Sequence, residues 1–250
     1  MICYTLTGGF MKIIISPAKQ MNVNNPINKD WILNKYSEQI QNALKSLHDK
    51  ELKKTLRVND SILKQVNGLH ENFDQPITYK AIDLYDGLAF RWMKKPALSN
   101  NALEYLNKNL LILSAFYGPI TPDTHIKPYR LDFISTLKID GENLRSFWTI
   151  PYSNSISKGE MLLNLASEEF STMFDKSRYN WIDFEFYESK DGVRKSHSTI
   201  SKKGRGLMVR YLAENNVIDI EEIKTFNLDG YRFDAKQSSD EKLVFAKYSI

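Results

Sequence analysis

The stretch from Leu110 to Phe133 constrains the possible folds more than any other part of the chain. It begins with a short apolar run without polar alternation, which is typical of a strand covered on both faces in a parallel sheet. The run ends at Ser114, and a loop stiffened by three prolines then carries Tyr129 and Arg130. Ligands of open α/β sheets bind where the carboxyl ends of strands meet such loops. This loop is therefore a candidate binding segment, although a single loop of this kind is more often an ordinary solvated connection.

Two other apolar runs end in the same way. Lys12 to Ile15 stops at Ser16, and Met161 to Ala166 stops at Ser167, which is well placed to cap the helix that follows. If the three runs are neighbouring parallel strands, their carboxyl ends meet at one edge of the sheet. We therefore expect one rim of the sheet to carry Lys19, Tyr117, Arg130 and Asn164.

The order of the expected elements predicts a mixed α/β (α+β) fold, with a central mixed, partly parallel sheet flanked by helices. Apolar residues at helical spacing predict helices over 31–50, 61–70, 100–108 and 207–215. A small helix is predicted over 143–148, and Pro151 is expected to oppose its continuation. The short helices over 51–56 and 61–70 are close enough to form a helix-hairpin-helix element, a motif that grips phosphate backbones, although the hairpin lacks the usual glycine.

Cysteine content and hydrophobicity limit the cellular setting. Cys3 is the only cysteine of the 250 residues, which excludes an internal disulfide framework and suits a reducing cytoplasm. No hydrophobic run approaches the roughly 20 residues of a membrane helix, and Met1 to Phe10 lacks the features of a signal peptide. We expect a cytoplasmic protein without membrane contact, in which residues 1–10 are an extension before a natural start at Met11 and residues 11–250 form a single domain.

Charge is balanced overall but unevenly distributed. The 34 basic and 30 acidic residues leave a net charge of only +4, which by itself does not imply nucleic acid. Residues 192–210, however, contain six cations and no acid. This stretch is either a solvated face or an anion-binding segment, and the complete absence of acids favours the second.

Two glycines in this stretch suggest how it would bind an anion. Gly204 and Gly206 are expected to lie just before a helix, where backbone N–H groups can face an anion at the positive end of the helix dipole. The element is neither a P-loop nor a dinucleotide fingerprint, because residues that each motif requires are missing. Lys202, Lys203 and Arg205 would add charge to the rim, which then suits a phosphate, a nucleotide or a nucleic acid.

The hydroxyl and histidine side chains indicate less. Ser16, Ser114 and Ser167 are more often caps or strand-end groups than nucleophiles, since no base is linked to them in the sequence. Tyr85 and Tyr117 are evenly balanced between core packing and a place in the lining of a site. The four histidines show no ligand spacing with one another, with cysteine or with carboxylates, so we expect no metal site and no cofactor.

Eight short motifs follow one another along the chain: residues 16–19, 85–88, 113–118, 127–131, 147–148, 164–167, 202–208 with Arg210, and 230–234. Together they resemble the bacterial YaaA peroxide stress protein family, formerly a family of unknown function. The resemblance runs from Lys12 to the last expected strand. It implies a cytoplasmic α/β protein that helps cells survive hydrogen peroxide by limiting free intracellular iron. It also implies a positively charged cleft and a helix-hairpin-helix-like element around 53–69.

Two departures from the family pattern concern local structure. The family has a glycine in the stretch before its Gly-Leu pair, whereas residues 79–85 have an extra residue and no glycine, which puts the local turn in question. The family's alanine before Arg-Gly is Gly204 here, which is expected to loosen that loop without changing its charge.

Two hypotheses from different classes remain. The first is a monomeric nucleic-acid binder, non-enzymatic or weakly enzymatic, whose partner is duplex DNA or a nucleotide-like anion. Its binding residues would be Lys19, Lys80, Tyr117, Arg130, Lys202, Lys203, Arg205 and Arg210. The second is an enzyme that acts on a nucleotide or a flipped base in the same cleft, and its catalytic candidates are Ser16, Lys19, Tyr85 and Asp132. Direct iron storage is disfavoured, because neither clustered carboxylates nor histidine or cysteine ligands occur at bundle spacing.

Overall fold

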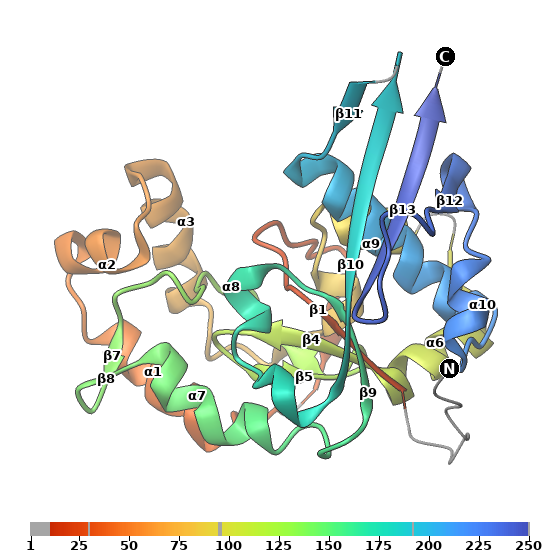
Figure 1. The fold of residues 1–250 in the computed structure, drawn as a ribbon. Helices are drawn as coiled ribbons and strands as arrows, with labels where there is room; N and C mark the ends of the chain where they lie inside the picture. The colour runs from red at the N-terminus through yellow and green to blue at the C-terminus, as the bar shows by residue number, and fades with distance from the viewer. Residues whose placement is uncertain (1–10, 30, 95–96, 192, 250) are drawn as a thin grey trace.

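The computed structural model describes residues 11–29, 31–94, 97–191 and 193–249 (Figure 1). Its centre is a mixed sheet in the order β12-β13-β10-β9-β1-β4-β5, with β11 paired to β10. The central strands are parallel to one another: β13 (Lys242–Ser249), β10 (Asn180–Lys190), β9 (Met161–Leu165), β1 (Met11–Ile15) and β4 (Leu110–Ser114). Antiparallel strands complete the sheet: β12 (Tyr231–Phe233), β11 (Val193–Lys195) and β5 (Gly118–Ile120). The predicted mixed α/β fold is confirmed, while the expected extension, residues 1–10, lies outside the described residues.

The apolar runs noted in the sequence form the middle of this sheet. β1 lies between β4 and β9, with Ile13 paired to Leu110 on one side and to Leu163 on the other. All three of these side chains are buried, as expected of strands covered on both faces. The carboxyl ends of the three strands therefore meet at one edge of the sheet, as predicted.

Helices lie on both sides of these strands (Figure 1). One group packs together beside the sheet: α5 (Leu88–Lys94), α6 (Asn100–Asn109), α9 (Ser198–Glu214) and α10 (Ile220–Lys224). Across β1 and β4 lie α1 (Lys35–Lys45), α7 (Leu144–Ser153) and the short α8 (Glu168–Ser171). On α7, the buried Trp148 and Tyr152 donate to Ala115 O (2.8 Å) and Ser114 O (3.1 Å). These bonds hold α7 against the end of β4, so the helix continues through Pro151, contrary to expectation; a proline removes only one helical hydrogen bond there.

A pair of helices stands apart from the sheet in Figure 1: α2 (Asp49–Leu56) and α3 (Asp60–Glu71). They correspond to the two segments predicted to form a helix-hairpin-helix element. Arg57 takes the left-handed conformation at the hairpin (φ 52°), a position that glycine usually fills. Asn59 then caps α3 by accepting a hydrogen bond from Ile62 N at 2.9 Å. The hairpin therefore closes without a glycine.

The helix expected over 31–50 is shorter and is divided. α1 begins after Asn34, whose side chain accepts a hydrogen bond from Ser37 N at 2.9 Å, and ends at Lys45. Trp31 lies before the helix, where its indole donates to His125 O at 2.7 Å. α2 is a separate helix that begins at Asp49.

Small elements complete the described part of the chain. A second sheet contains β2 (Ile27–Asn28), β3 (Ile77–Lys80) and β6 (His125–Ile126), and a hairpin contains β7 (Lys138–Ile139) and β8 (Glu142–Asn143). The remaining pieces are α4 (Ala81–Leu84) and the 3-10 turns η1 (Lys176–Arg178) and η2 (Leu228–Gly230). Residues 79–85, which lack the family's glycine, thus form the end of β3, the single turn of α4 and its C-cap, Tyr85.

The anion-binding loop expected around Gly204 and Gly206 does not occur, because this segment is part of α9. The helix begins at Ser198, so Gly204 and Gly206 lie in its interior, where their N–H groups belong to the helix. A Cβ on Gly204 would overlap the ring of Phe186 in β10, and a Cβ on Gly206 would overlap the carbonyl of Ala89 in α5. The two glycines therefore allow close packing of α9, and the loosened loop expected at Gly204 does not occur.

Candidate functional site

Ser16 and Ser167 meet where β1 and β9 end. Their Oγ atoms lie 3.0 Å apart, and Ser16 Oγ also accepts a hydrogen bond from Ser167 N at 2.8 Å. Ser167 has the extended backbone of the predicted N-cap of α8, but its hydroxyl makes no capping bond among the described residues. The two hydroxyls thus hold the strand ends together, and a catalytic role for Ser16 stays a prediction.

Tyr85, Tyr117 and Tyr129 form a buried network behind this edge. Tyr129 OH lies 2.8 Å from Tyr85 OH and 2.9 Å from Ser114 Oγ, while Tyr117 OH donates to Lys127 O at 2.9 Å. Burial raises the pKa of Tyr129 to about 12 and raises the pKa of Tyr85 and Tyr117 well above the usual range, so all three hydroxyls are neutral at pH 7. Tyr85 is fully buried and Tyr117 is 5% exposed. Neither ring is available to a ligand, which corrects the placing of Tyr117 among the phosphate-binding residues and of Tyr85 among the catalytic candidates.

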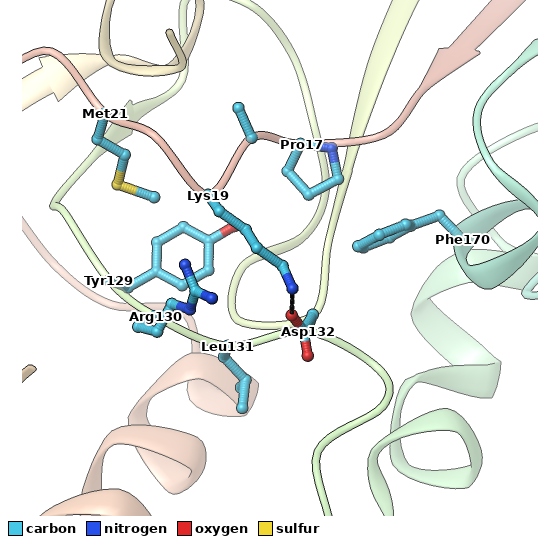
Figure 2. A pocket seen from close by; sticks show the side chains of 9 residues that line it. Pro17, Lys19, Met21, Tyr129, Arg130, Leu131, Asp132 and Phe170 are labelled. Carbon is cyan, nitrogen blue, oxygen red and sulfur yellow. Dashed lines mark ion pairs between the residues drawn. The ribbon is translucent and has the colours of Figure 1, made fainter. Parts of the chain in front are cut away.

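Lys19 and Asp132 form an ion pair in a small recess at the end of β1 (Figure 2). Lys19 Nζ lies 2.8 Å from Asp132 Oδ2, and the exposed fraction is 55% for the lysine side chain and 10% for the aspartate side chain. The recess has a volume of about 60 Å³. A second cation and several apolar or aromatic groups complete its lining: Pro17, Ala18, Met21, Tyr129, Arg130, Leu131 and Phe170. An amine and a carboxylate that lie far apart in the sequence therefore face the same small volume.

Glu169, in the first turn of α8, adds a second carboxylate near Asp132. Its Oε1 accepts a hydrogen bond from Phe133 N at 3.0 Å. Burial, followed by the negative charge of Asp132, raises the pKa of Glu169, while the hydrogen bond from Phe133 N and the charges of Lys19 and Arg145 act in the opposite direction. Glu169 thus fixes the backbone next to Asp132 and shares its cationic surroundings.

A larger cleft of about 670 Å³ opens beside the recess. The two hollows adjoin, because they share the lining residues Lys19, Met21, Tyr129 and Arg130. Arg91 of α5 brings a third cation, and its NH2 group lies 2.9 Å from Asp86 Oδ2. α3 supplies an amide and an apolar wall: Ile62, Gln65, Val66 and Leu69. The helix-hairpin-helix element therefore borders a cleft whose charged groups are three cations and one acid.

The other predicted phosphate-binding cations lie outside both linings. Lys80 and Lys202 are exposed at the end of β3 and on α9. Lys203 Nζ is 2.5 Å from Asp229 Oδ2, and Arg210 forms an ion pair with Glu214 at 3.2 Å. The acid-free stretch of the sequence thus receives acidic partners from elsewhere in the chain.

Arg205 is a partly buried cation of α9. Its Nε is buried and has no hydrogen-bond partner among the described residues. Burial lowers the pKa of the guanidinium, and the charge of Asp183 partly offsets this. Asp183 in turn accepts a hydrogen bond from the amide of Asn164 at 2.7 Å, so Asn164 of the predicted rim is already engaged. Of the predicted set, the structure brings together Lys19, Arg130 and Asp132.

Arg91, Glu169 and the wall supplied by α3 were not predicted from the sequence. Arg91 lies within the short, largely apolar α5, and a cation in such a helix does not by itself indicate a binding site. The feature of the sequence that could have drawn attention to Arg91 was the nearby Asp86, with which it pairs. Glu169 stood out only as a favourable charge near the start of a helix.

Within the described ranges, no group of three or more His, Cys, Asp or Glu residues is placed to hold a metal ion. Nor does any helix in the described part of the chain have the length and apolar character needed to cross a membrane.

Fold and site together define a mixed α/β protein with a lysine–carboxylate recess and an adjoining cationic cleft at the carboxyl ends of parallel strands. The family model described as Peroxide stress protein YaaA matches residues 11–237. The chain belongs to the YaaA peroxide stress protein family.

Curated relatives that carry the name UPF0246 protein agree with this assignment. One from Streptococcus gordonii is 35% identical over 240 residues, which cover 95% of this chain and 98% of the relative. One from Fusobacterium nucleatum is 35% identical over 247 residues, covering 95% and 99%. One from Francisella tularensis subsp. novicida is 32% identical over 255 residues, covering 95% and 100%. The similarity therefore extends over nearly the whole length of each of these proteins.

Proposed function

We propose that this peroxide stress protein acts by binding duplex DNA, or another phosphate-bearing ligand, in the 670 Å³ cleft. One observation carries the proposal: three segments distant in the sequence bring Lys19, Arg91 and Arg130 to one cleft that the helix-hairpin-helix element borders. Cations arranged in this way neutralise phosphates. Lys19 and Arg91 pair with Asp132 and Asp86, and α3 adds no acid to the lining of the cleft. The lowering of free intracellular iron, which the family resemblance implies, is proposed to follow from this binding; tight, stoichiometric iron binding by the purified protein would contradict it.

The salt dependence of binding tests the proposal. Fluorescence anisotropy with a labelled duplex should give an association constant that falls steeply with salt, with a log–log slope of about −0.9 for each phosphate contact. Lys202→Ala, which removes an exposed cation of α9 outside the cleft, tests whether the DNA footprint extends beyond the cleft. An affinity that does not change between low and moderate salt would rule out phosphate binding as the basis of the function.

A second candidate is an enzyme that acts on a nucleotide or nucleobase in the same place. The Lys19–Asp132 pair favours it, because phosphate binding alone does not require a lysine held against a largely buried carboxylate. A screen of nucleotides and damaged oligonucleotides would reveal turnover. No turnover in that screen, together with normal peroxide protection by a Lys19→Ala variant, would exclude this candidate.

A further inference from the structure

The size of the recess limits which group can enter it from the cleft. Its volume of about 60 Å³ corresponds to about four to six water molecules, at roughly 10–15 Å³ each by the same kind of measure. This is room for a sugar ring but not for a sugar together with a purine or pyrimidine. The recess can therefore hold a base-free sugar, whereas the base of an intact nucleotide would have to stay outside it.

The reactive groups of the recess suit the chemistry of a base-free sugar. A deoxyribose without its base is in equilibrium with an open form that carries an aldehyde at C1′, and aldehydes react with primary amines. Lys19 is the lysine in the lining of the recess, and Arg130 beside it cannot serve as a nucleophile, because a guanidinium stays protonated. Asp132 lies 2.8 Å from the amine and is 10% exposed, so it can take a proton from the amine with little competition from water.

The surrounding groups hold this arrangement in place. Glu169 accepts a hydrogen bond from Phe133 N, which fixes the chain directly after Asp132. Arg130 and Arg91 stand in the adjoining cleft, where they can bind the phosphates on either side of the sugar. Lys19 itself is 55% exposed, so its amine is accessible from the cleft as well as from the recess. An ion pair that only joined two loops would need neither a recess beside it nor an amine that is accessible from the cleft.

We propose that Lys19 forms a reversible imine with the C1′ aldehyde of a base-free deoxyribose in DNA, and that Asp132 carries the protons of this reaction. The proposal rests on the proposed function, because the cleft must first bind the flanking phosphates. Its substrate class is DNA with an abasic site. Lys19 is a catalytic residue in this reaction, whereas Glu169 is a positioning residue that acts through Asp132.

The reaction is a condensation without oxidation or reduction. Asp132 accepts a proton from the lysine ammonium, and the free Nζ attacks C1′, so that a C–N bond forms while the electrons of the C=O double bond move to oxygen. The attacking nitrogen, which now carries a positive charge, gives one proton to that oxygen, and a neutral carbinolamine results. Its hydroxyl then takes the proton from Asp132 and leaves as water, and the nitrogen lone pair forms the C=N bond. The products are one protonated imine and one water molecule, Asp132 is again a carboxylate, and addition of water reverses the step.

Borohydride trapping tests the proposal on the full-length protein. A labelled duplex with one abasic site is mixed with the protein, and sodium borohydride reduces any imine to a stable amine. A covalent protein–DNA band is expected, and peptide mapping by mass spectrometry should place the modification on Lys19. Lys19→Arg keeps the charge and an ion pair with Asp132 but cannot form this adduct, so it should lose the band and retain DNA binding. Asp132→Asn should slow adduct formation by ~10²-fold.

Lys158→Ala is the matched control. Lys158 is an exposed lysine just before β9, at the edge of the sheet opposite the recess, and its removal should leave the band unchanged. An adduct of equal strength in Lys19→Arg, or one that maps to surface lysines, would overturn the proposal. Binding of the abasic duplex without any adduct would overturn it while leaving the proposed function intact. If the duplex does not bind at all, the imine proposal and the proposal that the cleft binds duplex DNA are both wrong.

Discussion

At the scale of single residues, burial separates the groups that serve the core from those that can meet a ligand. Tyr117 and Lys19 follow the ends of neighbouring parallel strands, and the sequence placed both on the rim. Tyr117 is 5% exposed and its hydroxyl is bonded to the backbone of Lys127, whereas the side chain of Lys19 is 55% exposed beside Asp132. Residues that follow neighbouring strands at one sheet edge can therefore differ greatly in exposure.

Tyr117→Phe tests this distinction. The hydroxyl donates to Lys127 O and accepts from Lys127 N, so its loss leaves two buried backbone groups without their partner. We expect the free energy of unfolding to fall by ~1–3 kcal/mol, while the affinity for duplex DNA stays that of the wild type. Denaturant unfolding and anisotropy measure the two quantities. A variant of normal stability with weakened DNA binding would return Tyr117 to the ligand site.

Glu169→Gln tests the electrostatics beside the recess. The folded-state pKa of Glu169 is raised, so the folded protein favours the protonated form, and ionisation of this side chain weakens folding once the pH exceeds the pKa of Glu169 in the unfolded chain. Glutamine is neutral and keeps the acceptor for Phe133 N, so the variant should have a higher Tm than the wild type at pH 7. The difference should shrink as the pH falls and vanish below the pKa of Glu169 in the unfolded chain.

Thermal unfolding across a pH series measures this effect, and Glu168→Gln is its control, since Glu168 is a neighbour on the same helix whose carboxylate does not contact Phe133 N. Little change is expected for the control. A lower Tm for Glu169→Gln at pH 7 would mean that the hydrogen bond from Phe133 N and the attraction to Lys19 and Arg145 outweigh burial and repulsion by Asp132, so that the pKa of Glu169 is lowered rather than raised.

At the scale of elements, α9 shows how packing decides the meaning of a sequence pattern. Two glycines close together among cations suggested a loop, since glycine weakens helices. In the structure both glycines are buried on α9, and the absence of a Cβ lets the helix approach both β10 and α5. The sequence could not show this, because Phe186 and Ala89, which require the close approach, lie far away in the chain.

Replacing these glycines by alanine separates packing from helix propensity. Gly204→Ala would place a Cβ in the ring of Phe186, and the resulting strain should lower the free energy of unfolding by ~1–3 kcal/mol. Gly68 lies in α3 with open space around it, so Gly68→Ala should raise the free energy of unfolding by ~0.5–1 kcal/mol. Denaturant unfolding of both variants measures the contrast. Equal gains from both substitutions would show that Gly204 is not held in place by packing.

At the scale of the whole molecule, strand runs were predictable and long-range partners were not. The runs that end at Ser16, Ser114 and Ser167 were long and apolar enough to identify the centre of the sheet and its carboxyl edge. The partners of Lys203, namely Asp229 at 2.5 Å and Glu188 at 3.8 Å, are supplied by folding. Charge counted along the sequence therefore overstated the contribution of α9 to the cleft.

The difference between local strand patterns and long-range contacts also explains which part of the site was not predicted. Lys19, Arg130 and Asp132 lie directly after recognisable strands or in the proline-stiffened loop, so their convergence followed from the topology. Arg91 reaches the cleft because α5 packs against α9, a contact without a local signal in the sequence. The cleft is thus a property of the assembled molecule, to which strands, a helical hairpin and a packed helix each contribute one wall.

The central claim is that the cleft beside the recess binds phosphates, and the salt dependence of an Arg91→Ala/Arg130→Ala variant tests it most directly. Both side chains line the cleft, and Lys158→Ala removes a cation at the opposite edge of the sheet as a control. We expect the double variant to bind duplex DNA more weakly, with a log–log salt slope that is shallower by about 0.9 for each phosphate it no longer neutralises, and the control to behave like the wild type. A double variant whose affinity and salt slope both equal those of the wild type would contradict the claim.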